Sequence, residues 1–143
     1  SHLMLRGIQD ALYKESGIET GLDDLILSSG GWNHTEAEKF IDNWLGEDDD
    51  TELLICGNDN LALGAVNALQ KNGLKVGSDI HVLGGRNTNL GTMVRPEISS
   101  VDYHYPELVK LAVQQLVRRI EGDKSLPLTM KINGHLVERD STG

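Results

Sequence analysis

Residues with hydrogen-bonding side chains follow directly after a short apolar segment near the middle of the chain. The segment Leu53–Cys56 contains only apolar residues, which is typical of a parallel strand covered on both faces. Gly57, Asn58 and Asp59 come next, and ligands of such sheets bind at the carboxyl ends of the strands. The amide and carboxylate groups could hydrogen-bond a polar small molecule there, or they could form a capped turn that binds nothing.

A helix is predicted immediately after this turn. Apolar residues recur at the spacing of one helical face, at Ala62, Ala65, Val66 and Leu69. The helix therefore starts near Asp59, whose carboxylate would cap the first N–H groups and suits the positive end of the helix dipole. Gly73 is expected to end this helix.

The same alternation of strand and helix runs through the first half of the chain. A helix is predicted at Leu5–Ser16, ended by Gly17, and a strand at Leu22–Leu27. A second helix begins at the capping-box spacing of Thr35–Glu38, and another strand covers Asp79–Leu83. This alternation predicts an α/β fold of three layers, α/β/α, around a mostly parallel, doubly wound sheet with helices on both faces.

The alternation changes after the third strand. Proline suits the first turn of a helix and glycine suits the residue after its end, which sets the limits of one long helix. The remaining elements are an irregular connection, a strand, the long helix and a last strand, expected at Thr88–Pro96, Ile98–Tyr103, Pro106–Gly122 and Thr129–Val137.

The composition excludes several classes of function. Thirteen Lys and Arg residues stand against 22 Asp and Glu residues, giving a formal net charge of −9 at pH 7. Binding to nucleic acid phosphates needs clustered basic residues, so this chain is not expected to contact DNA itself. No apolar segment approaches the ~20 residues that cross a bilayer, and no membrane partner is predicted. The single cysteine, Cys56, is expected to be a small core residue.

Motifs of common enzymes and metal sites are missing from the sequence. No dinucleotide-binding glycine motif, phosphate-binding loop or serine nucleophile motif is found. The histidines at positions 34, 81, 104 and 135 are scattered over different elements without pairs four residues apart, so no metal site is predicted. No catalytic residue, cofactor or enzymatic activity is therefore expected.

Several segments together resemble a known family. CGNDNLALGA at 56–65, NGLKVGSDIHVLGG at 72–85 and PEISSV at 96–101 look like the effector-binding domain of LacI/GalR-family transcriptional regulators, and LVERDST at 136–142 is similar to that domain's closing strand. The resemblance covers nearly the whole chain from Leu5. It implies a periplasmic-binding-protein-like fold of two α/β lobes, with a small-molecule effector bound between them.

The resemblance also implies how the chain is divided. Residues 1–4 are interpreted as a cloning remnant, and residues 5–143 as the C-terminal part of the effector-binding domain. Residues 5–101 and 135–143 would form the C-terminal lobe, whereas residues 105–132 would belong to the N-terminal lobe. Hinges are expected near 101–105 and 132–135. The DNA-binding helix-turn-helix and most of the N-terminal lobe would precede Leu5.

The effector contacts implied by the resemblance are Trp32, Asn58, Asp59, Arg86 and Tyr105. Trp32 offers a flat face on which a sugar or base can stack, although it could also fill the core. Asn58 supplies two donors and an acceptor, Asp59 could be only the helix cap, and Tyr105 could close over a ligand or pack against its helix.

Arg86 is a departure from the sugar-responsive members of the family, many of which have an aspartate at this place. A carboxylate accepts hydrogen bonds from ligand hydroxyls, whereas arginine accepts none. Arginine instead suits a carboxylate or phosphate, which it can hold with two parallel hydrogen bonds, unless it is a surface residue that binds nothing. The expected effector is a sugar, sugar phosphate, nucleobase or organic anion, and a neutral sugar is the less favoured of these.

The resemblance further implies a cytoplasmic homodimer that binds DNA only through the missing N-terminal domain. Two alternatives remain open: a periplasmic solute-binding protein of a transporter, which shares the fold, and a ligand sensor fused to another signalling output. The long helix carries a continuous apolar stripe, formed by Val109, Ala112, Val113, Leu116, Val117 and Ile120. Because the sheet that would cover this stripe lies outside the chain, the stripe is predicted to pack against a second copy.

Overall fold

The computed structural model describes residues 2–19, 31–45, 51–126 and 129–143, which belong to two separate units, Ser1–Gly30 and Gly31–Gly143. In the first unit, helix α1 (His2–Ser16) ends where Gly17 adopts a φ of 71°, as the sequence predicted. The helix includes residues 2–4, which were interpreted as a cloning remnant. The strand predicted at Leu22–Leu27 lies outside the described residues.

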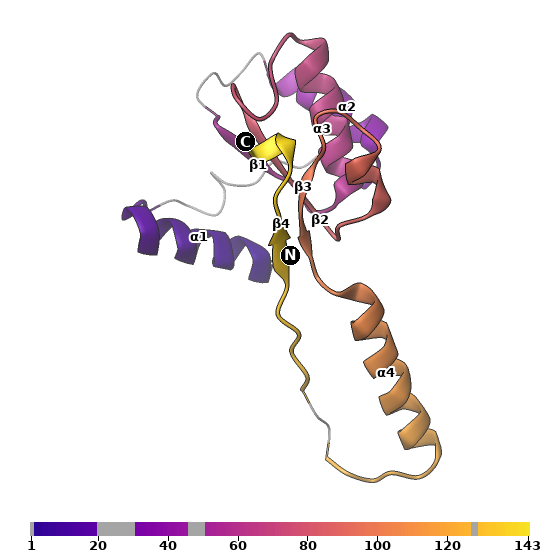
Figure 1. Cartoon of the computed structure of the whole chain (residues 1–143). Coiled ribbons are helices and arrows are strands. Elements are labelled where there is room, and N and C mark those ends of the chain that lie inside the picture. Colours follow the sequence, from indigo (N-terminus) through magenta and orange to yellow (C-terminus); the bar gives the residue numbers. More distant parts are fainter. Residues whose placement is uncertain (1, 20–30, 46–50, 127–128) are drawn as a thin grey trace. The chain divides into compact units, whose positions relative to one another are not determined.

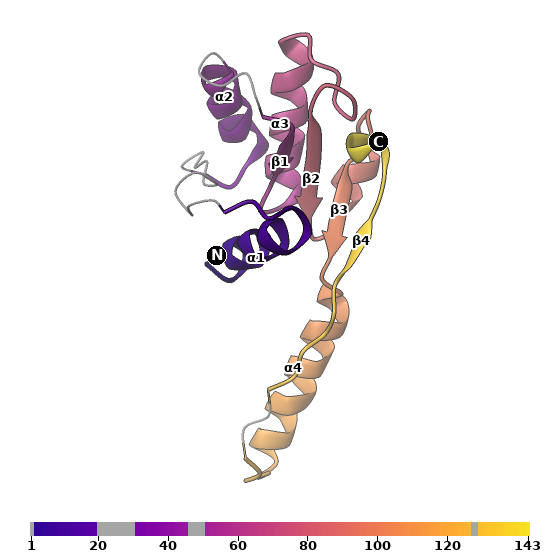
Figure 2. The ribbon, with the colours of Figure 1, turned by 90° about the vertical axis from the view of Figure 1, so that its left-hand side faces the viewer.

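The second unit is built on a sheet with the strand order β1-β2-β3-β4 (Figures 1 and 2). Strands β1 to β3 are parallel and β4 is antiparallel to β3, which confirms the prediction of a mostly parallel sheet. The strands are β1 (Leu53–Ile55), β2 (His81–Gly85), β3 (Ser99–Asp102) and β4 (His135–Val137). The helices of this unit are α2 (His34–Trp44), α3 (Asp59–Lys71), α4 (Tyr105–Ile120) and the short 3-10 turns η2 (Asn89–Thr92) and η3 (Asp140–Thr142).

The core lies between one face of this sheet and the helices α2 and α3. Leu54 of β1 and its partner Val82 of β2 point to this face. Together with Ile98, they pack against the apolar stripe of α3 that the sequence indicated. The buried members of that stripe are Ala62, Ala65, Val66 and Leu69. Burial of this one face fixes the position of the α3 N-terminus above the carboxyl ends of the strands.

The other face of the sheet is not covered by helices among the described residues of Gly31–Gly143. Leu53 and Ile55 point to that face and are 45% and 39% exposed, whereas Leu54 between them is buried. The expectation that Leu53–Cys56 is covered on both faces therefore stays a prediction, because the second unit by itself covers only one face. The periodicity of four apolar residues could not reveal which side a helix occupies.

Helices α2 and α3 cross at a close approach that requires glycine. A Cβ atom added at Gly64 would meet the backbone carbonyl of His34, and it would lie 2.7 Å from the Cβ of Ala37 and 2.9 Å from the nitrogen of Glu38. Real side chains do not tolerate such distances, so Gly64 sets how closely the two helices pack.

The cap of each helix lies earlier in the chain than the sequence suggested, by two residues for α2 and by one for α3. Asn33, not Thr35, caps α2, because its Oδ1 accepts the Glu36 N–H at 3.0 Å and its Nδ2 donates to the Glu36 carboxylate at 2.7 Å. Asn58, not Asp59, caps α3. Asparagine and aspartate are equally good caps, so neighbouring candidates could not be separated by residue type alone.

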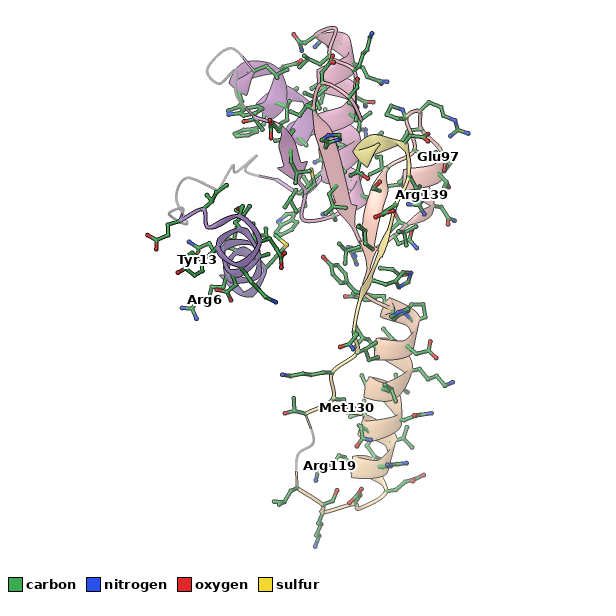
Figure 3. The ribbon with its side chains drawn as sticks, turned by 60° about the vertical axis from the view of Figure 1, so that its left-hand side comes forward. Arg6, Tyr13, Glu97, Arg119, Met130 and Arg139 are labelled. Carbon is green, nitrogen blue, oxygen red and sulfur yellow. The ribbon has the colours of Figure 1, made fainter. Side chains whose placement is uncertain are left out.

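The C-terminal residues connect β2 to β3. The Ser141 hydroxyl donates to the Val82 carbonyl at 2.6 Å and accepts the Ser99 N–H at 2.8 Å. Arg139 lies beside Glu97, as Figure 3 shows, with its Nε 3.9 Å from the carboxylate, and its Nη1 donates to the Ile98 carbonyl at 2.6 Å. Residues 139–142 therefore complete the sheet at the amino end of β3.

Helix α4 follows β3 and leads away from the sheet, and the chain returns to the sheet only at β4 (Figures 1 and 2). The last strand is shorter than predicted, because its ladder begins at His135 rather than at Thr129. Pro106 lies in the first turn of α4, and Gly122 adopts a φ of 98° after its end, as expected. None of the helices in the described part of the chain combines the length and the apolar character needed to cross a bilayer.

Substitution Gly64→Ala is expected to destabilise the second unit by about 1–3 kcal/mol, because the added methyl group overpacks the crossing of α2 and α3. The matched control is Gly7→Ala in α1, where an added Cβ meets nothing within 4 Å, and where alanine should be neutral or stabilising by up to about 1 kcal/mol. Urea unfolding followed by circular dichroism measures both changes. Equal stability of Gly64→Ala and the parent chain would contradict this account of the crossing.

Candidate functional site

The carboxyl ends of β1 and β2 lie side by side and bring together residues that are distant in sequence. A Cβ added at Gly85 would lie 3.4 Å from the Gly57 carbonyl oxygen, and one added at Gly57 would lie 3.9 Å from Cζ3 of Trp32. Arg86 follows Gly85 directly, and its guanidinium carbon is 5.1 Å from the centre of the Tyr105 ring. We call the surface formed by Trp32, Gly57, Asn58, Arg86 and Tyr105 the carboxyl-end surface.

Trp32 is a surface residue and does not fill the core. Its side chain is 75% exposed, although its ring edge lies close to Gly57. An exposed indole next to a turn with no side chain offers a flat apolar face to a ligand. The position agrees with a stacking role better than with the alternative of a core plug.

Asn58 is largely buried and has a structural task. Its Oδ1 accepts the Leu61 N–H at 2.9 Å and so caps α3. Only 8% of the residue is exposed. The cap occupies the amide oxygen, which leaves the Nδ2 group as the part of this side chain that can donate to a ligand.

Asp59 is a buried acceptor inside the lobe and is only 1% exposed. Its Oδ2 accepts both the N–H and, at 2.8 Å, the hydroxyl of Thr88, and its Oδ1 accepts the hydroxyl of Ser100 at 2.6 Å. The carboxylate thereby ties α3 to the loop after β2 and to β3. In this arrangement it presents no exposed oxygen to an effector, and it is not the helix cap that the sequence suggested.

Gly84 leaves the space that Asp59 needs. A Cβ at Gly84 would run into Oδ1 of Asp59 and would lie 3.4 Å from the Cβ of Ala62. Gly84 therefore serves the packing of α3 against the sheet. The glycine is visible in the sequence, but the Asp59 carboxylate that it accommodates across the core could not be predicted from the sequence.

Arg86 and Asn87 form a strained turn at the end of β2. Both residues have positive φ, 88° and 47°, which L-residues rarely adopt. The Arg86 N–H donates to the Val101 carbonyl at 2.8 Å, which holds the turn against β3. The turn directs the Arg86 guanidinium over the exposed Tyr105 ring, a cation–π arrangement that leaves the guanidinium N–H edges available for an anion.

No carboxylate within residues 2–19, 31–45, 51–126 and 129–143 forms an ion pair with Arg86. The described ion pairs involve the basic residues Lys71, Arg95 and Arg139 instead. An exposed arginine with a fixed backbone, an aromatic support and no acidic partner in the described structure is suited to bind an anionic ligand.

Asn87 holds the turn against β3 and the C-terminal segment, a role that the sequence did not reveal. Its N–H donates to the Ser100 hydroxyl at 2.9 Å, and its Nδ2 donates to the Asp102 carboxylate at 3.1 Å. Its Oδ1 accepts a hydrogen bond from Nη2 of Arg139 at 2.7 Å. The network joins the turn to β3 and to the C-terminal segment, so the direction of Arg86 depends on residues more than 50 positions later in the chain.

Two ionisable groups near this surface have shifted pKa values. The hydrogen bonds from Asn87 and from the His104 N–H lower the pKa of Asp102 below its ordinary value of 3.8, so this group is a carboxylate at neutral pH. Burial, and then the negative charge of Asp59, raise the pKa of the Cys56 thiol from 9.0 to about 12. Cys56 is therefore a protonated core thiol without nucleophilic character, in agreement with the sequence interpretation.

Residues 1–142 match the family described as periplasmic binding protein-like domain. The chain belongs to this family. Within it, catabolite control protein A of Priestia megaterium is 31% identical over 131 residues, a match that covers 79% of this chain and 40% of the relative. The chain thus spans less than half of the length of this relative.

Solved structures of the family agree with the fold. A LacI-type transcription regulator from Bifidobacterium animalis subsp. lactis superimposes with a TM-score of 0.88 at 30% identity, covering 97% of this chain and 49% of that one. A sugar-binding transcriptional regulator of the LacI family from Escherichia coli, complexed with phosphate, gives a TM-score of 0.79 at 27% identity, covering 96% and 48%. The resemblance to LacI/GalR regulators and the periplasmic-binding-protein-like fold are confirmed.

Substitution Asp59→Ala is expected to lower the free energy of unfolding by about 1.5–3 kcal/mol, because it removes a charged acceptor and leaves the buried Ser100 hydroxyl and Thr88 N–H without their partner. The matched control is Asn60→Ala, which changes the next residue of the same helix turn and should cost well under about 1 kcal/mol. Urea unfolding measures both. If the two variants are equally stable, Asp59 does not hold the lobe together.

Proposed function

We propose that this chain is the C-terminal part of the effector-binding domain of a LacI/GalR-type transcriptional regulator. The family membership and the regulators among its relatives support this proposal. The intact regulator would bind DNA through an N-terminal domain that is not part of this chain, and it would act in the cytoplasm, where the DNA is. It would not be an enzyme, since relatives such as those of Streptococcus thermophilus and Bifidobacterium animalis are named as transcriptional regulators.

The observation that carries the proposal is the carboxyl-end surface, which lies next to the proposed hinge at residues 101–105. Trp32 provides an apolar face, Asn58 an amide donor, and Arg86 with Tyr105 a supported cation, all at one edge of the lobe. Tyr105 is also the first residue of α4, directly after the chain leaves the sheet. A ligand that touches this surface would therefore contact the segment that joins the two lobes.

The path of the chain supports a proposed division into two lobes. We assign residues 5–101 and 135–143 to the C-terminal lobe and residues 105–132 to the N-terminal lobe, with hinges at 101–105 and 132–135. Helix α4 contributes no buried residue to the sheet of the described unit, as expected of a segment whose packing partners belong to another lobe. Its exposed stripe includes Leu116 at 60% and Ile120 at 76%.

The effector class that this surface favours is a small organic molecule with a carboxylate or phosphate group. Arg86 can hold such a group with two parallel hydrogen bonds, while Trp32 stacks on a ring or a sugar face. Asp59, which was predicted as a contact, would act indirectly by fixing α3 and Asn58. The phosphate in the solved Escherichia coli relative, itself named as sugar-binding, supports a sugar phosphate or related anion.

The alternatives predict different surroundings for the same lobe. A periplasmic solute-binding protein would be exported, and a sensor module would be fused to a signalling output. Relatives named as transcriptional regulators favour the proposed regulator over both alternatives. The gene sequence upstream of Leu5 distinguishes the three, because only the regulator needs a helix-turn-helix there.

A thermal-shift screen of the intact regulator against sugars, sugar phosphates, nucleobases and organic acids should identify an anionic effector, since a ligand of the native state raises the melting temperature. Arg86→Ala is then expected to weaken that effector by about 1.5–3 kcal/mol. Calorimetry measures the loss. The matched control is Arg95→Ala, which removes another exposed arginine, paired with Glu97 at 3.1 Å. Unchanged affinity in Arg86→Ala, or a neutral effector, would contradict the anion assignment.

We further propose that the isolated chain associates through the apolar stripe of α4, because such a stripe is rarely left in water. The parent chain should therefore give a dimeric or larger mass by light scattering at high micromolar concentration. Leu116→Glu should shift this mass toward the monomer. Gln114→Glu, which introduces the same side chain on the opposite face of the helix, should leave it unchanged. A monomeric parent chain would refute the association.

A further inference from the structure

Three potential metal ligands meet where the chain crosses to α4 and returns. Asp102 is the last residue of β3, and His104 directly precedes α4. His135, the first residue of β4, is the cross-strand partner of Asp102 in the antiparallel ladder. One ligand atom from each of these residues lies within 4.8 Å of the other two.

The distance between the two imidazole nitrogens fits two ligands on one metal ion. Nε2 of His104 and Nδ1 of His135 are 3.3 Å apart, with the rings tilted by 33°. Two nitrogens at about 2.0–2.1 Å from a tetrahedral zinc ion are separated by about 3.3–3.4 Å. The same separation also allows a hydrogen bond between the two rings when no ion is bound, with the donor set by the tautomer.

The surroundings hold the carboxylate and the backbone in position for binding. Oδ1 of Asp102 accepts the His104 N–H at 2.7 Å, and Oδ2 accepts Nδ2 of Asn87 at 3.1 Å. Each carboxylate oxygen has a second lone pair, so both hydrogen bonds can persist while one oxygen coordinates an ion. Such hydrogen bonds from outside the coordination sphere orient metal ligands in proteins.

The backbone of both segments also favours the cluster. His104 has left-handed backbone angles, φ 51° and ψ 47°, and its carbonyl accepts the Leu108 N–H as α4 begins. A Cβ at Gly134 would lie 2.8 Å from the Asp102 carbonyl oxygen, so glycine lets the returning segment approach β3 just before His135. A non-glycine residue held at positive φ is a costly feature of the kind found at functional sites.

We propose that Asp102, His104 and His135 bind a divalent transition-metal ion of the zinc type, with two imidazole nitrogens, one carboxylate oxygen and water as ligands. Two imidazoles and a carboxylate form a common ligand set for such an ion. The ion would link the segment that enters α4 to the segment that returns from it. This proposal does not depend on the identity of the effector.

The sequence alone predicted no metal site, because the histidines are scattered along the chain. That reasoning considered helical spacing only. The antiparallel pairing of β3 and β4 places position 135 opposite position 102, and no pattern within a single element could reveal this pairing. The three residues of the proposed site thus come together because of the register between β3 and β4.

Titration of the 143-residue chain with Zn²⁺ against a chromophoric chelator tests the proposal. The parent chain should bind one equivalent, and Co²⁺ in its place should give the visible absorption of a tetrahedral site. His135→Ala and His104→Ala should each weaken Zn²⁺ binding by at least about tenfold, since loss of a ligand should cost no less than loss of a supporting hydrogen bond. His135 is exposed, so its replacement should leave the fold intact, which circular dichroism verifies.

The matched control is His34→Ala, which removes an exposed imidazole at the start of α2 and should leave Zn²⁺ affinity unchanged. Asp102→Asn should weaken binding while keeping the size of the side chain. A parent chain that binds no Zn²⁺ overturns the proposal. Equal affinities of His135→Ala and His34→Ala overturn it as well, because the ion would then be held elsewhere on the chain.

Discussion

The buried carboxylate of Asp59 connects the parts of the lobe on which the candidate site depends. It accepts hydrogen bonds from Thr88, in the loop after β2, and from Ser100 on β3, while it belongs to the first turn of α3. A buried charge is costly unless it is fully hydrogen-bonded, and these three donors meet that requirement. Because the same carboxylate touches all three elements, the positions of Asn58 and of the Arg86 turn are coupled to one another through it.

Local patterns predicted much of the fold because they are imposed by local physics. The stripe from Ala62 to Leu69 marked α3, and Gly17 and Gly122 marked helix ends, since each signal depends only on the spacing or the backbone freedom of nearby residues. The choice between Asn58 and Asp59 as the cap was missed, because both side chains can accept the same N–H groups. Asp59 is not the cap because its carboxylate accepts a hydrogen bond from Ser100, which lies 41 positions away in the sequence.

The candidate site could be predicted only in part for the same reason. The local pattern placed Asn58 at the end of a strand, whereas the resemblance supplied Trp32, Arg86 and Tyr105 as contacts. The Asn87–Arg139 contact and the meeting of His104 with His135 depend on the antiparallel strand β4. No single segment encodes that pairing, because it arises from two segments on either side of α4 and from the space left by Gly134.

The position of β4 and η3 also has a consequence for biosynthesis. Ser141 supplies hydrogen bonds to both β2 and β3, and β4 completes the ladder of β3, so the sheet lacks these contacts until residues 135–143 have been synthesised. The segment with α4 emerges from the ribosome before them. In the proposed regulator the N-terminal lobe, which would be made earlier, would already offer a partner for the apolar stripe of this helix, whereas β2 and β3 would still lack the contacts of Ser141. The order of synthesis thus makes the sheet of the C-terminal lobe, and not the packing of α4, the part that is completed last.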